Sequence, residues 1–293
     1  SGGTVQLAGN ASTFALSPDL RLTQDARILL PAVDATVTAS YGLVGSKGDD
    51  VITGNAGDDA IYGGRGSDFL SGGAGDDTLV GASGTDTLMG GAGNDVFMTE
   101  ASERTAGSTT YFSDRIDGGA GQDSFRVQLP LTYDLPRQTF VMAAGSLTNV
   151  EELVVSNGYF STVSIDNQTW AGLSSFIASS TDSSEYYMPW LAITGNGTDI
   201  DFDAVQAGSK LSKVTLTGDF QNIDARNLSL AVTPAEQWSI QVSQLNSITL
   251  SSSSDWVIVN GDTQFDADGG SGDDRIQIQG IQKLIGTING GIG

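Results

Sequence analysis

The most regular feature of the sequence is a nine-residue alternation of small, acidic and large apolar positions between residues 45 and 98. Six consecutive nonapeptides carry glycine at their first and fourth positions and aspartate at their sixth. The eighth position is apolar in every copy and is filled in turn by Ile52, Ile61, Leu70, Leu79, Leu88 and Phe97. Glycine at this density disfavours a helix. One phased apolar residue per copy instead predicts short strands, each with its middle side chain turned inward, that alternate with turns.

Two further copies stand apart from this array. One begins at Gly118 (GGAGQDSFR), after a degenerate copy at 109–117, and the other begins at Gly269 (GGSGDDRIQ). Six copies in phase, with two more later, are a far stronger signal than an isolated glycine-rich sequence. The repeats therefore define two segments of similar local structure.

The segment 128–260 has a different pattern. Short alternating stretches such as EELVVSN, LSKVTLTG and DWVIVNG are separated by turn residues, which indicates an all-β region, either a sandwich or a wider solenoid. A solenoid is the favoured interpretation. One helix signal lies at 167–179. The first 40 residues also have strand patterns and are expected to cap the array or form its preceding rungs.

Composition narrows the classes of function. The formal net charge is −22, with 35 acidic and 13 basic residues, which argues against nucleic acid or an anionic membrane surface as partner. Cysteine and histidine are absent, so disulfides, His-dependent catalytic triads and His-ligated zinc sites are excluded. No apolar run approaches the roughly 20 residues of a membrane helix. We expect no membrane insertion, and we find no catalytic constellation, so the protein is not expected to be an enzyme.

The nonapeptide resembles the RTX (repeats-in-toxin) family of calcium-binding repeats, whose pattern is GGxGxDxUx with U large and apolar. This resemblance implies an all-β fold, a parallel β-roll, that continues into a β-solenoid or β-rich domain. The expected organisation is a cap or preceding rungs (1–40), a calcium β-roll (41–127), a β-rich solenoid-like domain (128–260) and a second, truncated RTX segment (261–293). Several calcium ions are the implied cofactors.

The chemistry of the repeat fits that ion. Glycine permits turns with positive φ and leaves their carbonyl groups unobstructed, and aspartate adds a hard anionic oxygen. Calcium takes six to eight oxygen ligands at 2.3–2.6 Å and accepts backbone carbonyls readily. Two turns and two strands close a coil of 18 residues, so each ion is expected between turns that stack one coil apart.

The family also implies which atoms bind each ion. A turn gives the carbonyls of its second and fourth positions and its aspartate, and the turn one coil later gives the carbonyls of its first and third positions and its own aspartate. Asn55, Gly57 and Asp59 would share an ion with Gly72, Ala74 and Asp77. The full set of implied metal ligands is Ser46, Gly48, Asp50, Asn55, Gly57, Asp59, Gly63, Gly64, Arg65, Gly66, Asp68, Gly72, Gly73, Ala74, Gly75, Asp77, Gly81, Ala82, Ser83, Gly84, Asp86, Gly90, Gly91, Ala92, Gly93, Asp95, Gly118, Ala120, Asp123, Gly269, Gly270, Gly272 and Asp274.

The second position departs from glycine at Ser46, Asn55 and Ala82. A carbonyl can still coordinate there, so weaker sites are expected rather than lost ones. The alternative to a calcium roll is an unfolded acidic linker, since residues 45–98 carry nine acidic and two basic side chains. A linker does not need phased apolar residues, however. The two interpretations combine if the segment is unfolded without calcium and folded with it.

Three other stretches are candidate sites. DIDFDAV places Asp199, Asp201 and Asp203 on one face of a strand, which suits a calcium site or catalytic carboxylates but fits a solvated face or an irregular turn at a coil edge better. EYYMPW (185–190) clusters aromatics that could stack on sugars or pack in a core. FDADGGSGDD (265–274) lacks the EF-hand spacing, so the nonapeptide interpretation is preferred.

The favoured function is a calcium-binding extracellular structural protein, part of a bacterial surface layer or large adhesin that is exported by type I secretion. Its expected partners are calcium, itself in a lattice, or cell-surface polysaccharide, with no nucleic acid. The alternatives are an accessory folding and secretion module of a larger RTX enzyme or toxin, and a carbohydrate-binding domain between two rolls. Because the sequence stops at TINGGIG (287–293), partway through a nonapeptide, we expect it to be a fragment of a longer protein.

Overall fold

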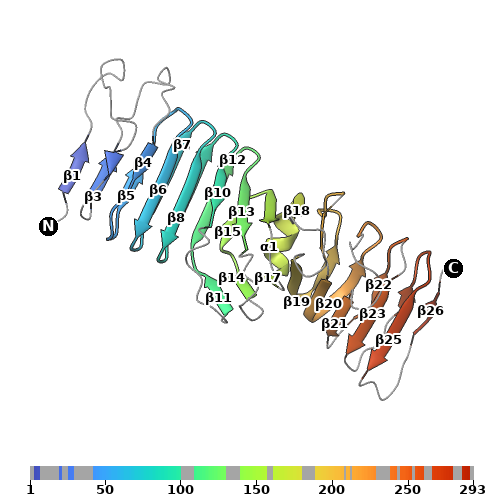
Figure 1. Ribbon diagram of the computed structural model, residues 1–293. Coiled ribbons are helices and arrows are strands. Elements are labelled where there is room, and N and C mark those ends of the chain that lie inside the picture. The colour runs from blue at the N-terminus through green and yellow to red at the C-terminus, as the bar shows by residue number, and fades with distance from the viewer. Residues whose placement is uncertain are drawn as a thin grey trace. The chain divides into compact units, whose positions relative to one another are not determined.

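The computed structural model describes residues 3–6, 20–21, 26–29, 42–99, 109–129, 139–156, 161–179, 189–207, 209–211, 213–228, 238–242, 245–252, 255–260, 266–279 and 286–290. In these residues the chain consists almost wholly of parallel β-strands, with one short helix (Figure 1). The all-β, parallel prediction is therefore confirmed. The chain divides into two compact units, of which unit 1 comprises Ser1–Arg104, Phe112–Gln128 and Gly145–Val154, and unit 2 comprises Thr105–Tyr111, Leu129–Ala144 and Val155–Gly293.

Unit 1 is built from two parallel sheets whose strands alternate along the chain. One sheet has the order β1-β3-β5-β7-β9-β12-β15, and the other contains β2-β4-β6-β8-β10-β13. Each turn therefore carries the chain from one sheet to the other. A strand of the array pairs with the strand two places earlier in the chain, as β7 does with β5. The strands are β1 (Gly3–Gln6), β2 (Leu20–Arg21), β3 (Ala26–Leu29), β4 (Gly42–Val44), β5 (Val51–Thr53), β6 (Ala60–Arg65), β7 (Phe69–Ala74), β8 (Thr78–Ser83), β9 (Thr87–Ala92), β10 (Val96–Met98), β12 (Arg115–Ala120), β13 (Ser124–Gln128) and β15 (Leu147–Thr148).

The core of the six-repeat array 45–98 is made mainly by the apolar residues at the eighth positions. In one sheet Ile52 is in register with Leu70, and Leu70 with Leu88. In the other sheet Ile61 is in register with Leu79, which pairs with Phe97. All of these side chains are at most 2% exposed. The prediction that the phased apolar residues face inward is confirmed, and their burial is the main apolar stabilisation of the roll.

Unit 2 is also parallel, with the strand order β11-β14-β17-β19-β20-β21-β23-β25 in its main sheet. The long strand β20 pairs with β21 through its first half and with β22 through Asn222–Asp224, and β24 and β26 continue from β22. Sandwiches are typically antiparallel, so this pairing favours the solenoid. The remaining strands are β11 (Thr109–Phe112), β14 (Thr139–Met142), β16 (Glu152–Ser156), β17 (Thr162–Asp166), β18 (Ser175–Ser179), β19 (Trp190–Asp201), β20 (Lys213–Asp224), β21 (Trp238–Val242), β22 (Ser247–Thr249), β23 (Trp256–Asn260), β24 (Asp266–Asp268), β25 (Arg275–Gln279) and β26 (Ile288–Asn289).

The helix α1 (Asn167–Gly172) is shorter than the predicted 167–179. Asp166 caps its N-terminus by accepting hydrogen bonds from the backbone N–H groups of Gln168 and Thr169. Beyond Gly172 the burial alternates residue by residue in β18, with Phe176 and Ala178 buried. That period of two is the strand pattern, so the prediction was wrong for the second half of the segment.

Candidate metal centres

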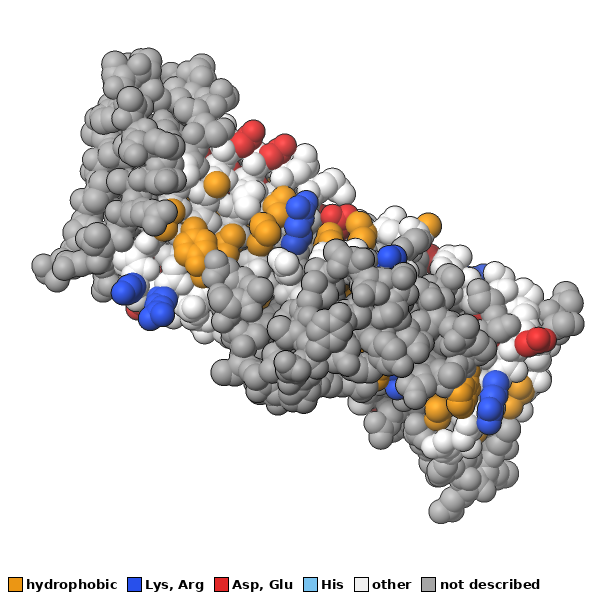
Figure 2. All heavy atoms as spheres, in the orientation of Figure 1, with side chains coloured by type: hydrophobic (Ala, Val, Ile, Leu, Met, Phe, Trp, Pro, Cys, Tyr) orange, Lys and Arg blue, Asp and Glu red, His pale blue; other side chains and the backbone are white. Residues whose placement is uncertain are grey.

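The turns of unit 1 stack in two columns at the ends of the strands. The turns 45–50, 63–68 and 81–86 lead into one sheet, and the turns 54–59, 72–77, 90–95 and 118–123 lead into the other. In each turn the fifth position is exposed and the sixth is buried, as at Asp76 and Asp77. Figure 2 shows acidic side chains, in red, along an edge of this unit. Each turn thus places a polar side chain in solvent beside a buried aspartate.

The buried aspartates form two hydrogen-bonded ladders. One carboxylate oxygen, Oδ1, accepts a hydrogen bond from the backbone N–H of the equivalent aspartate one coil earlier. The N–H of Asp59, for example, donates to Asp77 at 2.7 Å, and that of Asp77 donates to Asp95 at 2.8 Å. The same bond joins the pairs Asp50–Asp68, Asp68–Asp86, Asp86–Asp114 and Asp95–Asp123, at 2.7–2.8 Å. The predicted stacking of turns one coil apart is therefore present.

The second carboxylate oxygen, Oδ2, lacks a hydrogen-bond partner in most of these turns. Within the described residues this holds for five aspartates of unit 1 and for Asp274 of unit 2, and each of these oxygens is inaccessible to solvent. The unit 1 residues are Asp68, Asp77, Asp86, Asp95 and Asp123, all at most 3% exposed. A buried carboxylate oxygen without a donor or counterion costs several kcal/mol. These oxygens therefore fit a cation.

Backbone carbonyls converge on the same oxygens. A Cβ atom added to Gly63 would lie 2.4 Å from Oδ2 of Asp68 and 2.8 Å from the carbonyl oxygen of Gly81. At Gly90 the corresponding distances are 2.1 Å to Asp95 Oδ2 and 2.5 Å to the carbonyl oxygen of Gly118. The first position must therefore be glycine, because a carboxylate and a carbonyl from the next coil crowd its open side. A set of hard oxygens such as this one suits Ca²⁺.

Burial raises the pKa of these carboxyl groups. Loss of solvation is the largest cause, and neighbouring aspartates add to it. The pKa rises from 3.8 to about 7 for Asp68, Asp77 and Asp114, and to about 6 for Asp95. The pKa of Asp86 and Asp123 is raised as well. A bound cation lowers such a pKa because it favours the charged form.

The structure brings together the turns that the sequence predicted to share ions. The backbone N–H of Ala74 donates to the carbonyl of Asn55 at 2.8 Å, and Gly73, with φ of 120°, lies against that same carbonyl. Similarly, Arg65 N–H donates to the carbonyl of Ser46 at 3.3 Å. Each carbonyl oxygen has a second lone pair for a metal. Coordination by the individual residues of the predicted set remains a prediction.

The isolated repeat at Gly269 has a partner turn that sequence analysis missed. The backbone N–H of Asp255 donates to Oδ1 of Asp274 at 2.9 Å, which is the bond of the aspartate ladders. A Cβ added to Gly270 would lie 2.1 Å from the carbonyl oxygen of Ser251. The turn at 250–255 (LSSSSD) contains no glycine. The available signal was its aspartate at a sixth position, followed by the buried Val257 at an eighth.

Three other features of the ladders were missed. Asp114, in the degenerate repeat, keeps the sixth position, and its Oδ1 accepts from Asp86. Glu151 extends the other ladder, because its Oε2 accepts from the N–H of Asp123 at 2.9 Å. Besides the two buried ladders, an exposed row of hydrogen bonds joins residues at fifth positions, as in the bond from Asp76 N–H to Asp58 Oδ1 at 2.9 Å. The nine-residue spacing could have identified Asp114, but not Glu151.

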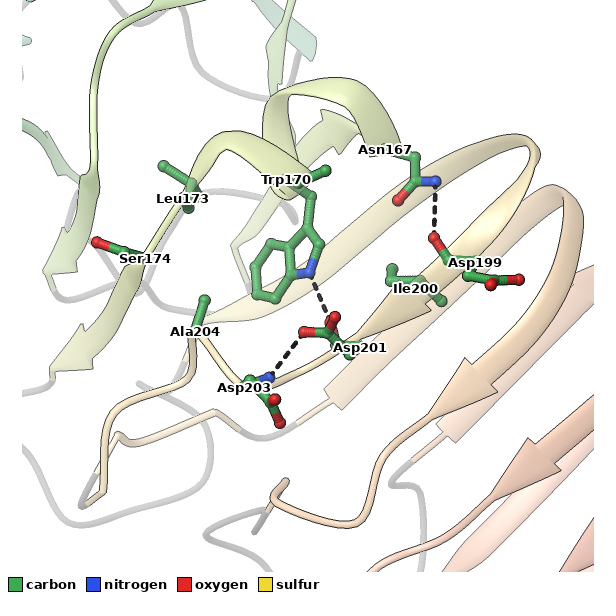
Figure 3. Close-up of a pocket in the computed structure, with 10 residues that line it drawn as sticks. Asn167, Trp170, Leu173, Ser174, Asp199, Ile200, Asp201, Asp203 and Ala204 are labelled. Carbon is green, nitrogen blue, oxygen red and sulfur yellow. Dashed lines mark hydrogen bonds between the residues drawn. The ribbon is translucent and has the colours of Figure 1, made fainter.

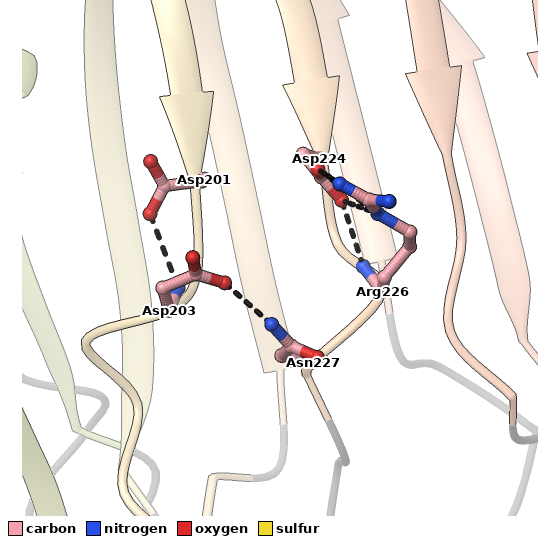
Figure 4. A network of polar contacts seen from close by, with 5 residues as sticks. All are labelled: Asp201, Asp203, Asp224, Arg226 and Asn227. Carbon is pink, nitrogen blue, oxygen red and sulfur yellow. Dashed lines mark hydrogen bonds and ion pairs between the residues drawn. The ribbon is translucent and has the colours of Figure 1, made fainter.

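The acidic stretch 199–203 borders a pocket of about 260 Å³ in unit 2, beside α1 (Figure 3). Trp170 Nε1 donates to the carbonyl of Asp201 at 2.7 Å. The side chains of Asp201 and Asp203 accept from Asp203 N–H and from Asn227, respectively, and Asp224 pairs with Arg226 (Figure 4). The side chains of Asp199, Asp201 and Asp203 are exposed, as predicted for a solvated coil edge.

The other predicted features can be placed only in part. Of EYYMPW, residues 185–188 lie outside the described residues, and Trp190 lies in β19. In the described part of the chain, no three acidic side chains gather closely enough to hold a metal by themselves. The roll sites instead combine aspartates with carbonyls. None of the helices in the described residues is long and apolar enough to cross a membrane.

These observations define a class of protein: a parallel β-roll with ladders of buried aspartates, whose turns offer oxygen ligands for a cation. Comparison with known families agrees, because residues 43–70, 62–97 and 108–126 match the RTX calcium-binding nonapeptide repeat, in four copies. The segment 43–126 therefore contains RTX repeats, which bind several Ca²⁺ ions and imply a calcium-binding, secreted β-roll protein. No curated protein and no solved structure matches the chain.

Proposed function

We propose that the chain is part of a calcium-stabilised structural protein of the bacterial surface, belonging to a surface layer or a large adhesin. The chain passes through type I secretion unfolded, while calcium is low, and folds outside the cell. Extracellular calcium modules bind at about 10⁻⁴–10⁻³ M, which suits such a switch. The observation that carries this proposal is the row of buried Oδ2 atoms that have no hydrogen-bond partner in the described part of the chain, because stacked coils of this kind need a cation.

The extent of the coiled structure supports an architectural role over an accessory one. An accessory RTX module of an enzyme or toxin needs only the repeats and a short cap. Here unit 2 has its own parallel sheet, with strands of 12 residues in β19 and β20. A long stack of coils presents extended surfaces, which suit contacts with further copies of the chain or with cell-surface polysaccharide.

A carbohydrate-binding domain is less well supported. The Nζ atom of Lys213 lies 4.7 Å from the centroid of the Trp190 ring, so a cation already covers one face of that indole. We also propose a non-enzymatic role. The carboxylates of Asp199, Asp201 and Asp203 accept hydrogen bonds from Asn222, from the Asp203 N–H and from Asn227, which suits bracing of the coil edge.

The folding switch is tested by circular dichroism and limited proteolysis of the purified chain in EGTA and in 5 mM calcium. We expect β-structure and protease resistance of residues 42–99 only with calcium. Equal β-signal and equal melting temperature in the two buffers would refute the switch. The lattice is tested separately by electron microscopy of the calcium-loaded chain. Ordered sheets support the surface-layer role, whereas dispersed particles argue against it.

A further inference from the structure

Nine of the sixth-position aspartates fall into two groups. In three turns Oδ2 accepts a hydrogen bond from the backbone N–H of the second position of its own turn: Ser46 to Asp50 at 2.6 Å, Asn55 to Asp59 at 2.8 Å, and Ser251 to Asp255 at 3.1 Å. We call these turns closed. In six other turns, which we call open, the corresponding Oδ2 has no partner within the described residues: Asp68, Asp77, Asp86, Asp95, Asp123 and Asp274.

The backbone conformation of the second position separates the two groups. In all six open turns φ at this position is positive: Gly64 114°, Gly73 120°, Ala82 74°, Gly91 119°, Gly119 102° and Gly270 76°. Ser46, Asn55 and Ser251 are not among the described residues with positive φ. Rotation about N–Cα changes the direction of the amide relative to the rest of the turn. A negative φ thus accompanies an N–H directed at the aspartate, and a positive φ accompanies one directed elsewhere.

The side chain at the second position fixes which state forms. Ser46 Oγ accepts from the N–H of Gly48 at 3.1 Å, and Asn55 Oδ1 accepts from the N–H of Gly57 at 2.6 Å. In the third closed turn, Ser251 Oγ donates to Asp255 Oδ2 at 2.8 Å. These local bonds stabilise a turn whose second position is not glycine. Glycine adopts positive φ without a steric penalty, and so it favours the open state.

Ala82 shows that the open state does not require glycine. Its φ of 74° is costly for a residue with a Cβ atom, yet Asp86 Oδ2 in the same turn has no hydrogen-bond partner among the described residues. The turn therefore keeps the open conformation despite strain. Backbone strain of this kind persists at sites with a function and is offset by the surrounding structure.

From these contacts we propose that the second position of each nonapeptide decides whether its turn requires a metal ion. Open turns take Ca²⁺ at Oδ2, whereas closed turns satisfy Oδ2 with their own N–H and stand without an ion. The proposal rests on the calcium function proposed above and refines it. It replaces the expectation that Ser46 and Asn55 merely weaken their sites, and it keeps a full site at Ala82.

The position of the closed turns gives this distinction a role. The closed turns of unit 1, 45–50 and 54–59, are the first described turns of their columns, and each donates the N–H of its aspartate to the first open turn above it. In unit 2 the closed turn 250–255 donates in the same way to the open turn 269–274. Each closed turn is therefore a metal-independent platform on which calcium-dependent turns stack.

The test counts calcium ions bound per chain by equilibrium dialysis with ⁴⁵Ca²⁺, on the full chain and on variants. Asn55→Gly opens a closed turn, and we expect one more ion per chain. Gly73→Asn closes an open turn, and we expect one fewer. Ala82→Gly is the matched control, since it keeps the turn open, and its ion count should equal that of the wild type.

A second measurement covers the case in which Gly73→Asn fails to fold. In EGTA, with a stabilising osmolyte such as TMAO to keep the calcium-free roll folded, Asn55→Gly removes the local bonds of a closed turn. Its melting temperature should therefore fall, while that of Ala82→Gly should not. An unchanged ion count in Asn55→Gly, together with an unchanged melting temperature in EGTA, would overturn the proposal. A wild-type chain that binds no calcium would instead refute the proposed function itself.

Discussion

Replacement of Asp77 by asparagine should have opposite effects on stability with and without calcium. Asp77 is 1% exposed, its Oδ1 accepts from Asp59 N–H at 2.7 Å, and its Oδ2 has no partner in the described residues. Asparagine keeps an oxygen for Asp59 but removes the charge. Without calcium the substitution relieves a buried charge, whereas with calcium it removes a ligand.

The magnitude follows from the pKa, which burial raises from 3.8 to about 7. Since tenfold in proton affinity is about 1.4 kcal/mol, keeping Asp77 charged at pH 8 costs at most roughly 4 kcal/mol, and relaxation of the turn reduces this to about 2 kcal/mol. Asp77→Asn should therefore raise the free energy of unfolding by about 2 kcal/mol in EGTA. With calcium at 100 times its Kd, the wild type gains about 2.7 kcal/mol from the ion that the variant loses. Set against the gain of about 2 kcal/mol from the missing charge, Asp77→Asn should be destabilised in calcium by a net of about 0.7 kcal/mol.

The assay is urea unfolding followed by circular dichroism at pH 8, in EGTA and in saturating calcium. If the calcium-free chain is largely unfolded, the same comparison is made in a stabilising osmolyte such as TMAO. Asp76→Asn is the matched control, because it removes the same charge from the exposed neighbouring position and should change stability little in either buffer. The reasoning is refuted if Asp77→Asn destabilises the chain equally in both buffers, or if the two variants behave alike.

Three further predictions concern protons, glycine and the core. In EGTA with a stabilising osmolyte such as TMAO, the fold should melt at a higher temperature at pH 5 than at pH 8. Burial raises the pKa values of Asp68 and Asp95 to about 7 and about 6, so the stability contributed by their protonation is complete below pH 3.8 and is lost as the pH rises through 6–7. A lower melting temperature at pH 5 would contradict this. Gly72→Ala would place a Cβ atom 2.1 Å from Asp77 Oδ2, whereas a Cβ atom added at Gly172 would meet nothing within 4 Å. Calorimetry should therefore show that Gly72→Ala lowers calcium affinity about tenfold or more, which is about 1.4 kcal/mol, and that Gly172→Ala does not. Leu79 is fully buried and in register with Ile61, so Leu79→Ala should lower the free energy of unfolding by about 2–5 kcal/mol in urea unfolding of the calcium-loaded chain. Met89, at a 39% exposed position, is the control, and a loss of stability in Leu79→Ala no larger than in Met89→Ala would contradict the assignment of the core.

The sequence predicted the roll well because local chemistry determines it. Glycine at the first position is required by the approach of Asp77 Oδ2 to Gly72, and the eighth position supplies the whole core of each coil, as Leu79 does. Both requirements recur every nine residues, so a period read from the sequence reports them directly. The same reasoning failed at 175–179, where a strand follows a helix that ends after six residues.

What could not be predicted depends on contacts between distant residues. Glu151 lies 28 residues from Asp123, and nothing in its own sequence neighbourhood marks it as the next rung of a ladder. Asp255 stands in a run of serines, and its role appears only when it lies beneath Asp274. Open and closed turns differ in φ at the second position and in the direction of the N–H of that residue. The sequence gives a hint of this difference only at second positions where another residue replaces glycine.

Calcium should occupy the buried oxygens between stacked turns. An anomalous difference map from crystals grown in calcium, with data collected at a long wavelength, would locate the ions directly. We expect peaks beside Oδ2 of Asp68, Asp77, Asp86, Asp95, Asp123 and Asp274, each bridging to the next coil. Coils that are intact in these crystals, with no anomalous density at those oxygens, would contradict it.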